Sequence, residues 1–244
     1  IQDAIDVALA SHNAGDLAQA RHIYEQILQA DSNHPIVLHL LGVICHHTNH
    51  NAKAISLISK AVSLKPDFAE AHSNLGLVLE HVDRLDDAVA SYGKAITINP
   101  RHPDAHLNLG NALTAIGKRK QAVDSYNKAL ALNPVFVEAH CNLGNVYRDL
   151  KKPKEAIESY NKALAIAPDF AGAHFGLGNA YGDLGRTDDA LASFKKAIAI
   201  NPDYYDARNN YEYVIAKTVE KEIYNLCSAV EDIVPAADRI TASG

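Results

Sequence analysis

Methionine and tryptophan are both missing from this sequence, and it contains only three cysteines. Because even the first residue is not methionine, we expect the chain to be a mature or excised fragment. Cys45, Cys141 and Cys227 lie far apart and are odd in number, which favours reduced thiols over a disulfide framework. This cysteine usage predicts a cytoplasmic protein.

Long apolar runs and clusters of basic residues are also missing. No stretch approaches the roughly 18 apolar residues that a membrane-spanning helix needs, so we expect no membrane insertion. The 23 basic and 29 acidic side chains are dispersed, give a net charge of -6, and offer no basic stripe for nucleic acid. Apolar residues make up 48% of the chain, which is ample for a buried core.

The sequence does contain a repeated unit of 34 residues. In its clearest copy, residues 103–136, small and apolar residues recur every three or four positions in two successive stretches, the pattern of two amphipathic helices. Gly117 separates the two stretches, and Asn133-Pro134 ends the second, because proline disfavours helical geometry in the residue before it. Each copy therefore predicts a helical hairpin.

Six complete copies follow one another without insertion or deletion. They cover residues 1–34, 35–68, 69–102, 103–136, 137–170 and 171–204. Residues 205–234 keep only the first-helix spacing and predict a capping helix, or a partial seventh repeat with a helical extension that ends at Pro235. Residues 235–244 are small and polar, and predict a tail or linker.

Four positions of the unit are nearly constant in kind. Position eight is small, position twenty is alanine, position twenty-four is usually aromatic and position thirty-two is usually proline, as in Gly110, Ala122, Tyr126 and Pro134. This pattern resembles the tetratricopeptide repeat (TPR) family, including the arrays of bacterial TPR proteins and of O-linked N-acetylglucosamine transferases. The resemblance implies an all-α fold, a right-handed α–α superhelix of helical hairpins. It also implies that positions two, five, six, nine, twelve and thirteen of each first helix line a concave groove.

Asparagines recur at two of those groove positions. Asparagine is a poor residue for a helix interior, so a row of them in one register needs a reason. One interpretation is that their carboxamides grip the main chain of an extended peptide, as similar residues are understood to do in the transferase arrays; the other is that they bond neighbouring helices to each other. The candidate peptide-binding residues are Asn74, Asn108, Asn111, Asn142, Asn145, Arg148, Asn179 and Asn210. Positions five and twelve are then expected to select ligand side chains.

Histidines are the other conspicuous group. His72, His106, His140 and His174 occupy position four of successive units, which places them too far apart for one metal ion and predicts rings packed between helices. Cys45, His46, His47 and His50 are denser, but they include no second cysteine or fixed carboxylate. We therefore predict no metal site and no cofactor, although this cluster leaves metal binding open.

No nucleophile, base and orienting group converge in these patterns, so we expect a chain that is not an enzyme. The favoured interpretation is a protein–protein interaction scaffold that binds an extended peptide or a partner helix. Two alternatives remain: the substrate-recognition arm of a larger transferase, such as a glycosyltransferase, and a scaffold that self-assembles through its C-terminal helix. The sequence does not identify the partner.

Overall fold

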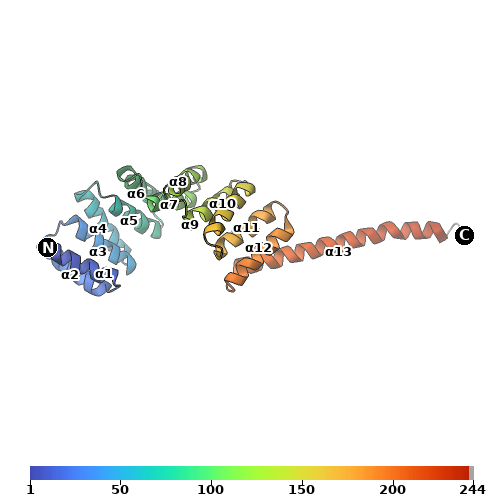
Figure 1. The fold of residues 1–244 in the computed structure, drawn as a ribbon, viewed down its shortest axis with the longest axis horizontal. Helices are drawn as coiled ribbons and strands as arrows, with labels where there is room; N and C mark the ends of the chain where they lie inside the picture. The colour runs from blue at the N-terminus through green and yellow to red at the C-terminus, as the bar shows by residue number, and fades with distance from the viewer. Residues whose placement is uncertain (242–244) are drawn as a thin grey trace. The chain divides into compact units, whose positions relative to one another are not determined.

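The computed structural model describes residues 1–241, with side chains described to residue 227 (Figure 1). Within that range the chain forms thirteen helices and no strand, which confirms the predicted all-α fold. Its internal contacts divide it into two compact units, Ile1–Asn142 and Leu143–Gly244, with the boundary inside α9. Each unit is described by itself.

Unit 1 consists of four helical hairpins and the start of α9. Its helices are α1 (Gln2–Asn13), α2 (Leu17–Ala30), α3 (Pro35–His47), α4 (Asn51–Leu64), α5 (Ala69–His81), α6 (Leu85–Ile98), α7 (Pro103–Ala115) and α8 (Arg119–Leu132). Unit 2 continues from α9 (Val137–Asp149) through α10 (Pro153–Ile166), α11 (Ala171–Asp183), α12 (Thr187–Ile200) and α13 (Tyr205–Thr241). From α1 to α8 in unit 1, and from α10 to α13 in unit 2, each helix packs mainly on the next one along the chain.

Every first helix ends in the same way. Position fifteen has a positive φ in all six units, and this residue is Gly15, Asn49, Asp83, Gly117, Lys151 or Gly185. The amide of the following residue donates back to a carbonyl in the last turn of the helix, as Lys118 N does to Leu113 O at 2.8 Å. This is the Schellman arrangement, in which a left-handed residue satisfies carbonyls at the helix end. A fixed C-cap of this kind sets where each second helix starts.

The small residue at position eight makes room for the large side chain at position twenty-four. A Cβ added to Gly110 would stand 2.5 Å from the ring of Tyr126, and one added to Gly144 would stand 2.6 Å from the ring of Tyr160. Tyr126 is 1% exposed and Tyr160 is 0% exposed, so both rings are core residues. The two helices of a hairpin are therefore held together by a ring packed against backbone.

The position-four histidines are buried, as predicted, and they also make a hydrogen bond that the sequence did not indicate. Each imidazole Nε2 lies 2.9–3.1 Å from the carbonyl oxygen of the proline six residues earlier, as His106 does with Pro100. This bond ties the start of each first helix to the loop before it. Burial, the largest influence, lowers the pKa of His72 and of His106.

The last helix is longer than the sequence indicated. α13 runs from Tyr205 to Thr241 and passes through Pro235, where the pattern predicted its end. Proline keeps a helical φ and removes only one backbone donor, so a helix can continue across it at a cost in stability. The expected tail is thus helical up to Thr241, and its last three residues lie outside the described range.

Candidate peptide-binding site

The candidate residues lie on the first helices of the repeats, at positions six, nine and twelve. We call these positions together the first-helix face. Asn74, Asn108, Asn111, Asn142, Asn179, Asn210 and Arg148 are half-buried, and Asn145 is exposed.

In unit 1 two asparagines are bonded to each other across a repeat boundary. Asn142 Nδ2 donates to Asn111 Oδ1 at 2.9 Å, and the hydroxyl of Tyr126 donates to the same oxygen at 2.8 Å. Burial raises the pKa of Tyr126 to about 12, so its hydroxyl keeps its proton at neutral pH. With both lone pairs of Asn111 Oδ1 engaged, the orientation of this carboxamide is fixed.

Asn74 makes a different contact because position nine of the preceding repeat is a valine, Val43, rather than asparagine. Its Nδ2 lies 2.8 Å from Nε2 of His39, which is 1% exposed. The ring of His39 also packs edge-on against Phe68, with 4.9 Å between centroids. Burial, followed by the charge of His12, lowers the pKa of His39 to about 4, so this imidazole is neutral and accepts the amide proton.

Asn108 differs from the other asparagines at position six. Position nine of the preceding repeat is Leu77, which offers no acceptor. Within the part of the chain that the structure describes, the Asn108 carboxamide has no hydrogen-bond partner. Its donor and acceptor are both left for solvent or a ligand.

Unit 2 repeats the bonded arrangement. Asn210 Nδ2 donates to Asn179 Oδ1 at 2.8 Å, and the Tyr160 hydroxyl donates to Asn145 Oδ1 at 2.7 Å. Arg148 at position twelve pairs with Asp183 at position thirteen of the next repeat, with Nε and Oδ2 3.0 Å apart. Both members of this ion pair are partly exposed, which limits its contribution to stability to about 0–1 kcal/mol.

The bonds between helices correspond to the second interpretation of the asparagine row, yet they leave part of each carboxamide unused. The Oδ1 atoms of Asn74, Asn142 and Asn210 and the Nδ2 atoms of Asn111, Asn145 and Asn179 make no hydrogen bond within the described chain. The internal bonds hold these acceptors and donors in place. The row can therefore offer oriented acceptors and donors to a main chain.

Position five was expected to select ligand side chains, but it is buried in the first five repeats and half-buried, as Phe175, in the sixth. Its members Ser73, Leu107 and Cys141 are 4%, 4% and 6% exposed, and His39 is buried too. The sequence analysis did not predict the hydrogen bonds of the tyrosine hydroxyls. Three repeats carry asparagine at position nine, and two of them also carry a tyrosine, Tyr126 or Tyr160, at position twenty-four, whereas the third carries Phe194.

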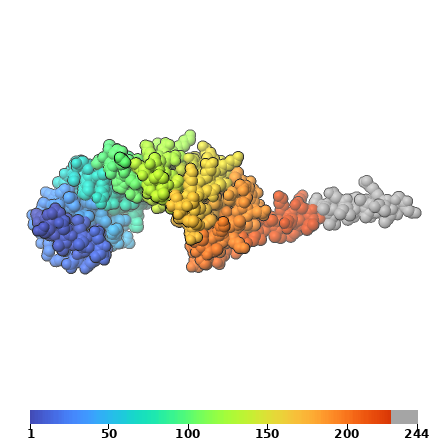
Figure 2. Space-filling view, viewed as in Figure 1, coloured from blue at the N-terminus to red at the C-terminus, as the bar shows by residue number. Residues whose placement is uncertain are grey.

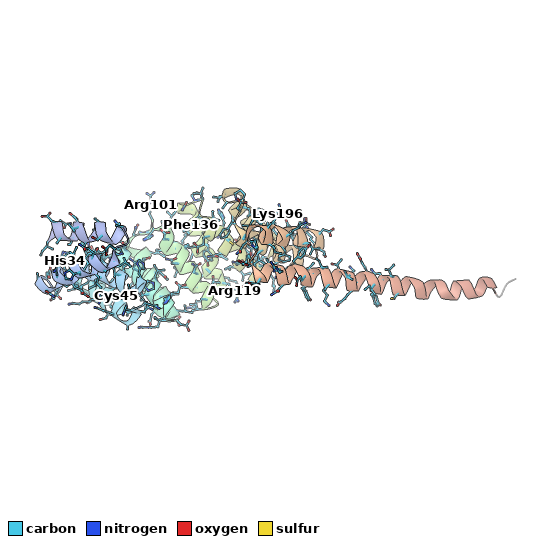
Figure 3. All side chains as sticks on the ribbon, turned by 90° about the horizontal axis from the view of Figure 1, so that it is seen from below. His34, Cys45, Arg101, Arg119, Phe136 and Lys196 are labelled. Atoms are coloured by element: carbon cyan, nitrogen blue, oxygen red, sulfur yellow. The ribbon has the colours of Figure 1, made fainter. Side chains whose placement is uncertain are left out.

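Cys45, His46 and His47 lie in the last turn of α3, and His50 immediately precedes α4. Cys45 is 1% exposed inside the helix stack (Figure 3), and burial raises the pKa of its thiol. His46 Nδ1 lies 2.8 Å from Asn51 Oδ1, and His50 Nδ1 lies 3.1 Å from Thr48 Oγ1. In the described residues no group of three or more histidine, cysteine or acidic side chains is arranged to hold a metal ion.

Family models for the repeat match most of the chain. Models described as TPR repeat match residues 83–117, 110–151 and 144–185, and models described as tetratricopeptide repeat match residues 12–76 and 171–204. The chain belongs to the tetratricopeptide repeat family. The repeated C-cap, the glycine–tyrosine contact and the buried position-twenty alanines are thus features of a TPR array.

Several solved TPR structures share the fold. A MamA protein is 28% identical, with a TM-score of 0.65 over 70% of this chain and 94% of its own. YrrB, described as a TPR protein with an unusual peptide-binding site, is 22% identical, with a TM-score of 0.67 over 78% of this chain and 97% of its own. TTC0263, a TPR protein of Thermus thermophilus, is 24% identical, with a TM-score of 0.58 over 75% of this chain and 99% of its own. No curated protein matches the sequence.

Within the described residues, no helix combines the length and the apolar character needed to cross a membrane.

Proposed function

We propose that this TPR chain is a non-catalytic interaction scaffold whose first-helix face binds the main chain of an extended peptide. The observation that carries the proposal is the set of half-buried carboxamides, oriented by hydrogen bonds from neighbouring repeats, that still have unused acceptors and donors. A peptide N–H would donate to Asn142 Oδ1, and a peptide carbonyl would accept from Asn111 Nδ2. Such pairing depends little on the sequence of the peptide.

The surroundings of Asn108 support the same role. Asn108 offers an unsatisfied carboxamide in unit 1, and Leu77, at position nine of the preceding repeat, offers an apolar side chain that is 39% exposed. Unit 2 offers Asn145, Asn179 and Asn210 with the Arg148–Asp183 pair beside them. YrrB, which has the same fold, is described as having a peptide-binding site, and this favours a peptide as the ligand.

The decisive test separates main-chain from side-chain recognition. Asn108→Ala combined with Asn142→Ala should weaken binding to immobilised peptide arrays about tenfold or more, which corresponds to about 1.4 kcal/mol. Asn127→Ala is the matched control, because Asn127 is exposed on the second helix α8. N-methylated peptides, which lack main-chain donors, should bind more weakly than peptides with alanine in place of single side chains. Equal binding by the double variant and the control would refute the proposal.

A second candidate role is self-assembly through α13. Beyond the turns that pack on α12, Val219, Ile223 and Leu226 are 47%, 56% and 67% exposed. The orange-to-red part of α13 leaves the helices of unit 2 in Figure 2. An exposed apolar strip of this kind favours burial against another helix. Sedimentation velocity tests the role: Ile223→Ser with Leu226→Ser should convert an oligomer to a monomer, and a wild-type chain that is monomeric at every concentration would exclude it.

A further inference from the structure

Four histidines in unit 1 lie in a continuous row at the ends of three first helices. His12 is in the last turn of α1, His46 and His47 are in the last turn of α3, and His81 is in the last turn of α5. The ring centroids of His12 and His47 are 6.1 Å apart, those of His47 and His46 are 6.1 Å apart, and those of His46 and His81 are 5.3 Å apart. We call these four side chains the imidazole row.

The imidazole row occupies positions twelve and thirteen of successive repeats, and in unit 2 the same two positions hold an ion pair. In unit 2, position twelve and position thirteen of successive repeats are Arg148 and Asp183, which neutralise each other. In the imidazole row, the corresponding pairs are His12 with His47 and His46 with His81. Each contact is therefore made by two imidazoles, and protonation gives both of them the same positive charge. Protonation of the row therefore creates positive charge that its own pairs do not neutralise.

All four side chains lie in the last turns of helices, where the helix end carries a partial negative charge. Burial, followed by the charge of His47, lowers the pKa of His12. Neighbouring imidazolium groups repel one another. An anion placed against the row removes that repulsion, so protonation and anion binding support each other.

Several charged groups on the elements that pack against α1, α3 and α5 make contacts of their own. Arg21 and Lys53 pair with Glu25, Arg84 pairs with Asp87, Tyr92 donates to Glu80, and Asp16 accepts from the amide of Gln19. Asp6 on α1 accepts from Gln2, and Asp83 lies in the turn two residues after His81. No ion pair to any member of the row occurs among the described residues. The row lacks a carboxylate partner of its own.

Apolar side chains lie beside the row on the same first helices. Leu9 and Val43, at position nine of the first two repeats, are half-buried, and Leu77 in the third is 39% exposed. A ligand that lies along these helices therefore meets apolar side chains next to imidazoles. Protonated imidazoles complement carboxylates, and Leu9, Val43 and Leu77 complement apolar side chains, so a peptide with alternating acidic and apolar residues fits this surface.

We propose that the imidazole row is a proton-gated subsite of unit 1 that receives the carboxylate side chains of an acidic, partly apolar peptide. This inference rests on the proposed function, because the main chain of the peptide is held by the carboxamides of the first-helix face. Acidification through the usual titration range of histidine strengthens binding, since glutamate side chains stay ionised there.

The test compares two labelled decapeptides by fluorescence anisotropy. One alternates glutamate with leucine, and the other has glutamine in place of each glutamate. The glutamate peptide should bind about tenfold more tightly near pH 5.5 than near pH 7.5, whereas the glutamine peptide should change less than about twofold. Far-UV circular dichroism at both pH values checks that the helices persist.

Two variants identify the residues responsible. His46→Gln with His81→Gln should abolish most of the pH dependence, because glutamine keeps a polar side chain that does not titrate. His22→Gln is the matched control, since His22 is exposed on the second helix α2 and bonds to Gln26. The control should keep the wild-type pH dependence.

The outcomes distinguish the two proposals. If the glutamine peptide binds and Asn108→Ala weakens it, but the glutamate peptide shows no pH dependence, only the imidazole subsite is refuted. If neither peptide binds at either pH, both proposals fail. Equal pH dependence in the His46/His81 variant and the His22 control would assign the effect to other groups and overturn the subsite. Displacement of the glutamate peptide by polyuridylate, with tighter binding of the RNA, would also overturn it.

Discussion

At the residue scale, the most demanding position of the repeat is the fifteenth. All six residues there adopt a positive φ, but only three are glycine, and Lys151 at φ 60° has neither the freedom of glycine nor the short polar side chain of asparagine or aspartate. The sequence did not reveal this constraint, because Asn49, Asp83 and Lys151 do not look alike. The backbone bonds of the C-cap impose it.

Lys151→Gly should therefore stabilise unit 2. Relief of the left-handed conformation outweighs the larger entropy of glycine in the unfolded chain, for a net gain of about 0.5–1 kcal/mol. Gly117→Ala makes the opposite change in unit 1 and should cost about 1 kcal/mol. Urea unfolding followed by circular dichroism measures both; a loss of stability in Lys151→Gly would contradict the explanation.

His39 should make the stability of unit 1 depend on pH. Its pKa in the fold is about 4, below the ordinary value of 6.5, so between these values the unfolded chain binds more protons than the folded one. Stability from this group is complete above about pH 6.5 and is lost as the pH falls toward 4, by up to about 3 kcal/mol. Urea midpoints across this range should fall in the wild type.

A non-titrating ring at the same position provides the comparison. His39→Phe keeps the aromatic contact with Phe68 but should show a flatter pH profile, with the remaining slope due to histidines such as His72 and His106. His22→Gln, which alters an exposed imidazole, should leave the profile unchanged. Identical slopes in wild type and His39→Phe would show that His39 is not the group responsible.

At the scale of the helical hairpin, the ring at position twenty-four has one hydrophobic role and a variable polar one. The hydroxyls of Tyr126 and Tyr160 donate to asparagines, that of Tyr92 donates to Glu80, and that of Tyr24 has no partner among the described residues. The glycine–ring contact follows directly from the sequence pattern. The hydroxyl contacts do not, because each depends on which polar side chain the first helix of the same repeat places near the ring, Glu80 in one repeat and Asn111 or Asn145 in others.

Removing the hydroxyl should thus have opposite consequences in different repeats. Tyr126→Phe should cost about 1 kcal/mol, because Asn111 Oδ1 loses one of its two donors. Tyr24→Phe should be neutral or stabilising, because it removes a buried hydroxyl that has no partner among the described residues. Thermal and urea unfolding of the two variants measure the difference, and equal losses would contradict this assignment.

The sequence predicts part of the candidate site but not its hydrogen bonds. Which residues share the first-helix face follows from the 34-residue period, and the asparagine register was visible for that reason. The pairing of Asn142 with Asn111 but of Asn74 with His39 was not, since it depends on a single side chain, Val43, at position nine of another repeat. The burial of position five was likewise a property of packing between repeats.

At the scale of the whole molecule, the array is a chain of nearest-neighbour contacts that needs a cap at its end. The start of α13 supplies one for unit 2: Ala207 is 0% exposed, and Asn210 bonds to Asn179. Farther along, Tyr213, Lys217 and Lys221 still lie beside residues of α11 and α12. The capping role of α13 was expected from the sequence. Its continuation past Pro235 was not, because proline marks a helix boundary more often than it occurs inside a helix.

Two truncations should separate the cap from the rest of α13. A chain ending at Lys221 keeps the contacts with α11 and α12, and its unfolding free energy should change by less than about 0.5 kcal/mol. A chain ending at Tyr204 exposes the apolar side of α12 and should lose several times as much, about 2 kcal/mol or more. Urea unfolding of both chains tests this, and equal stability would show that α13 does not cap the array.

The contact between position twelve of one repeat and position thirteen of the next has a consequence for how such a chain can diversify. It holds two imidazoles at each of two boundaries in unit 1 and an arginine with an aspartate at one boundary in unit 2, while the glycine, alanine and tyrosine framework stays the same. The two residues at each boundary can therefore be replaced without disturbing the core. Replacing His46 with arginine and His81 with aspartate would change which ligands this part of unit 1 recognises and whether their binding responds to acid.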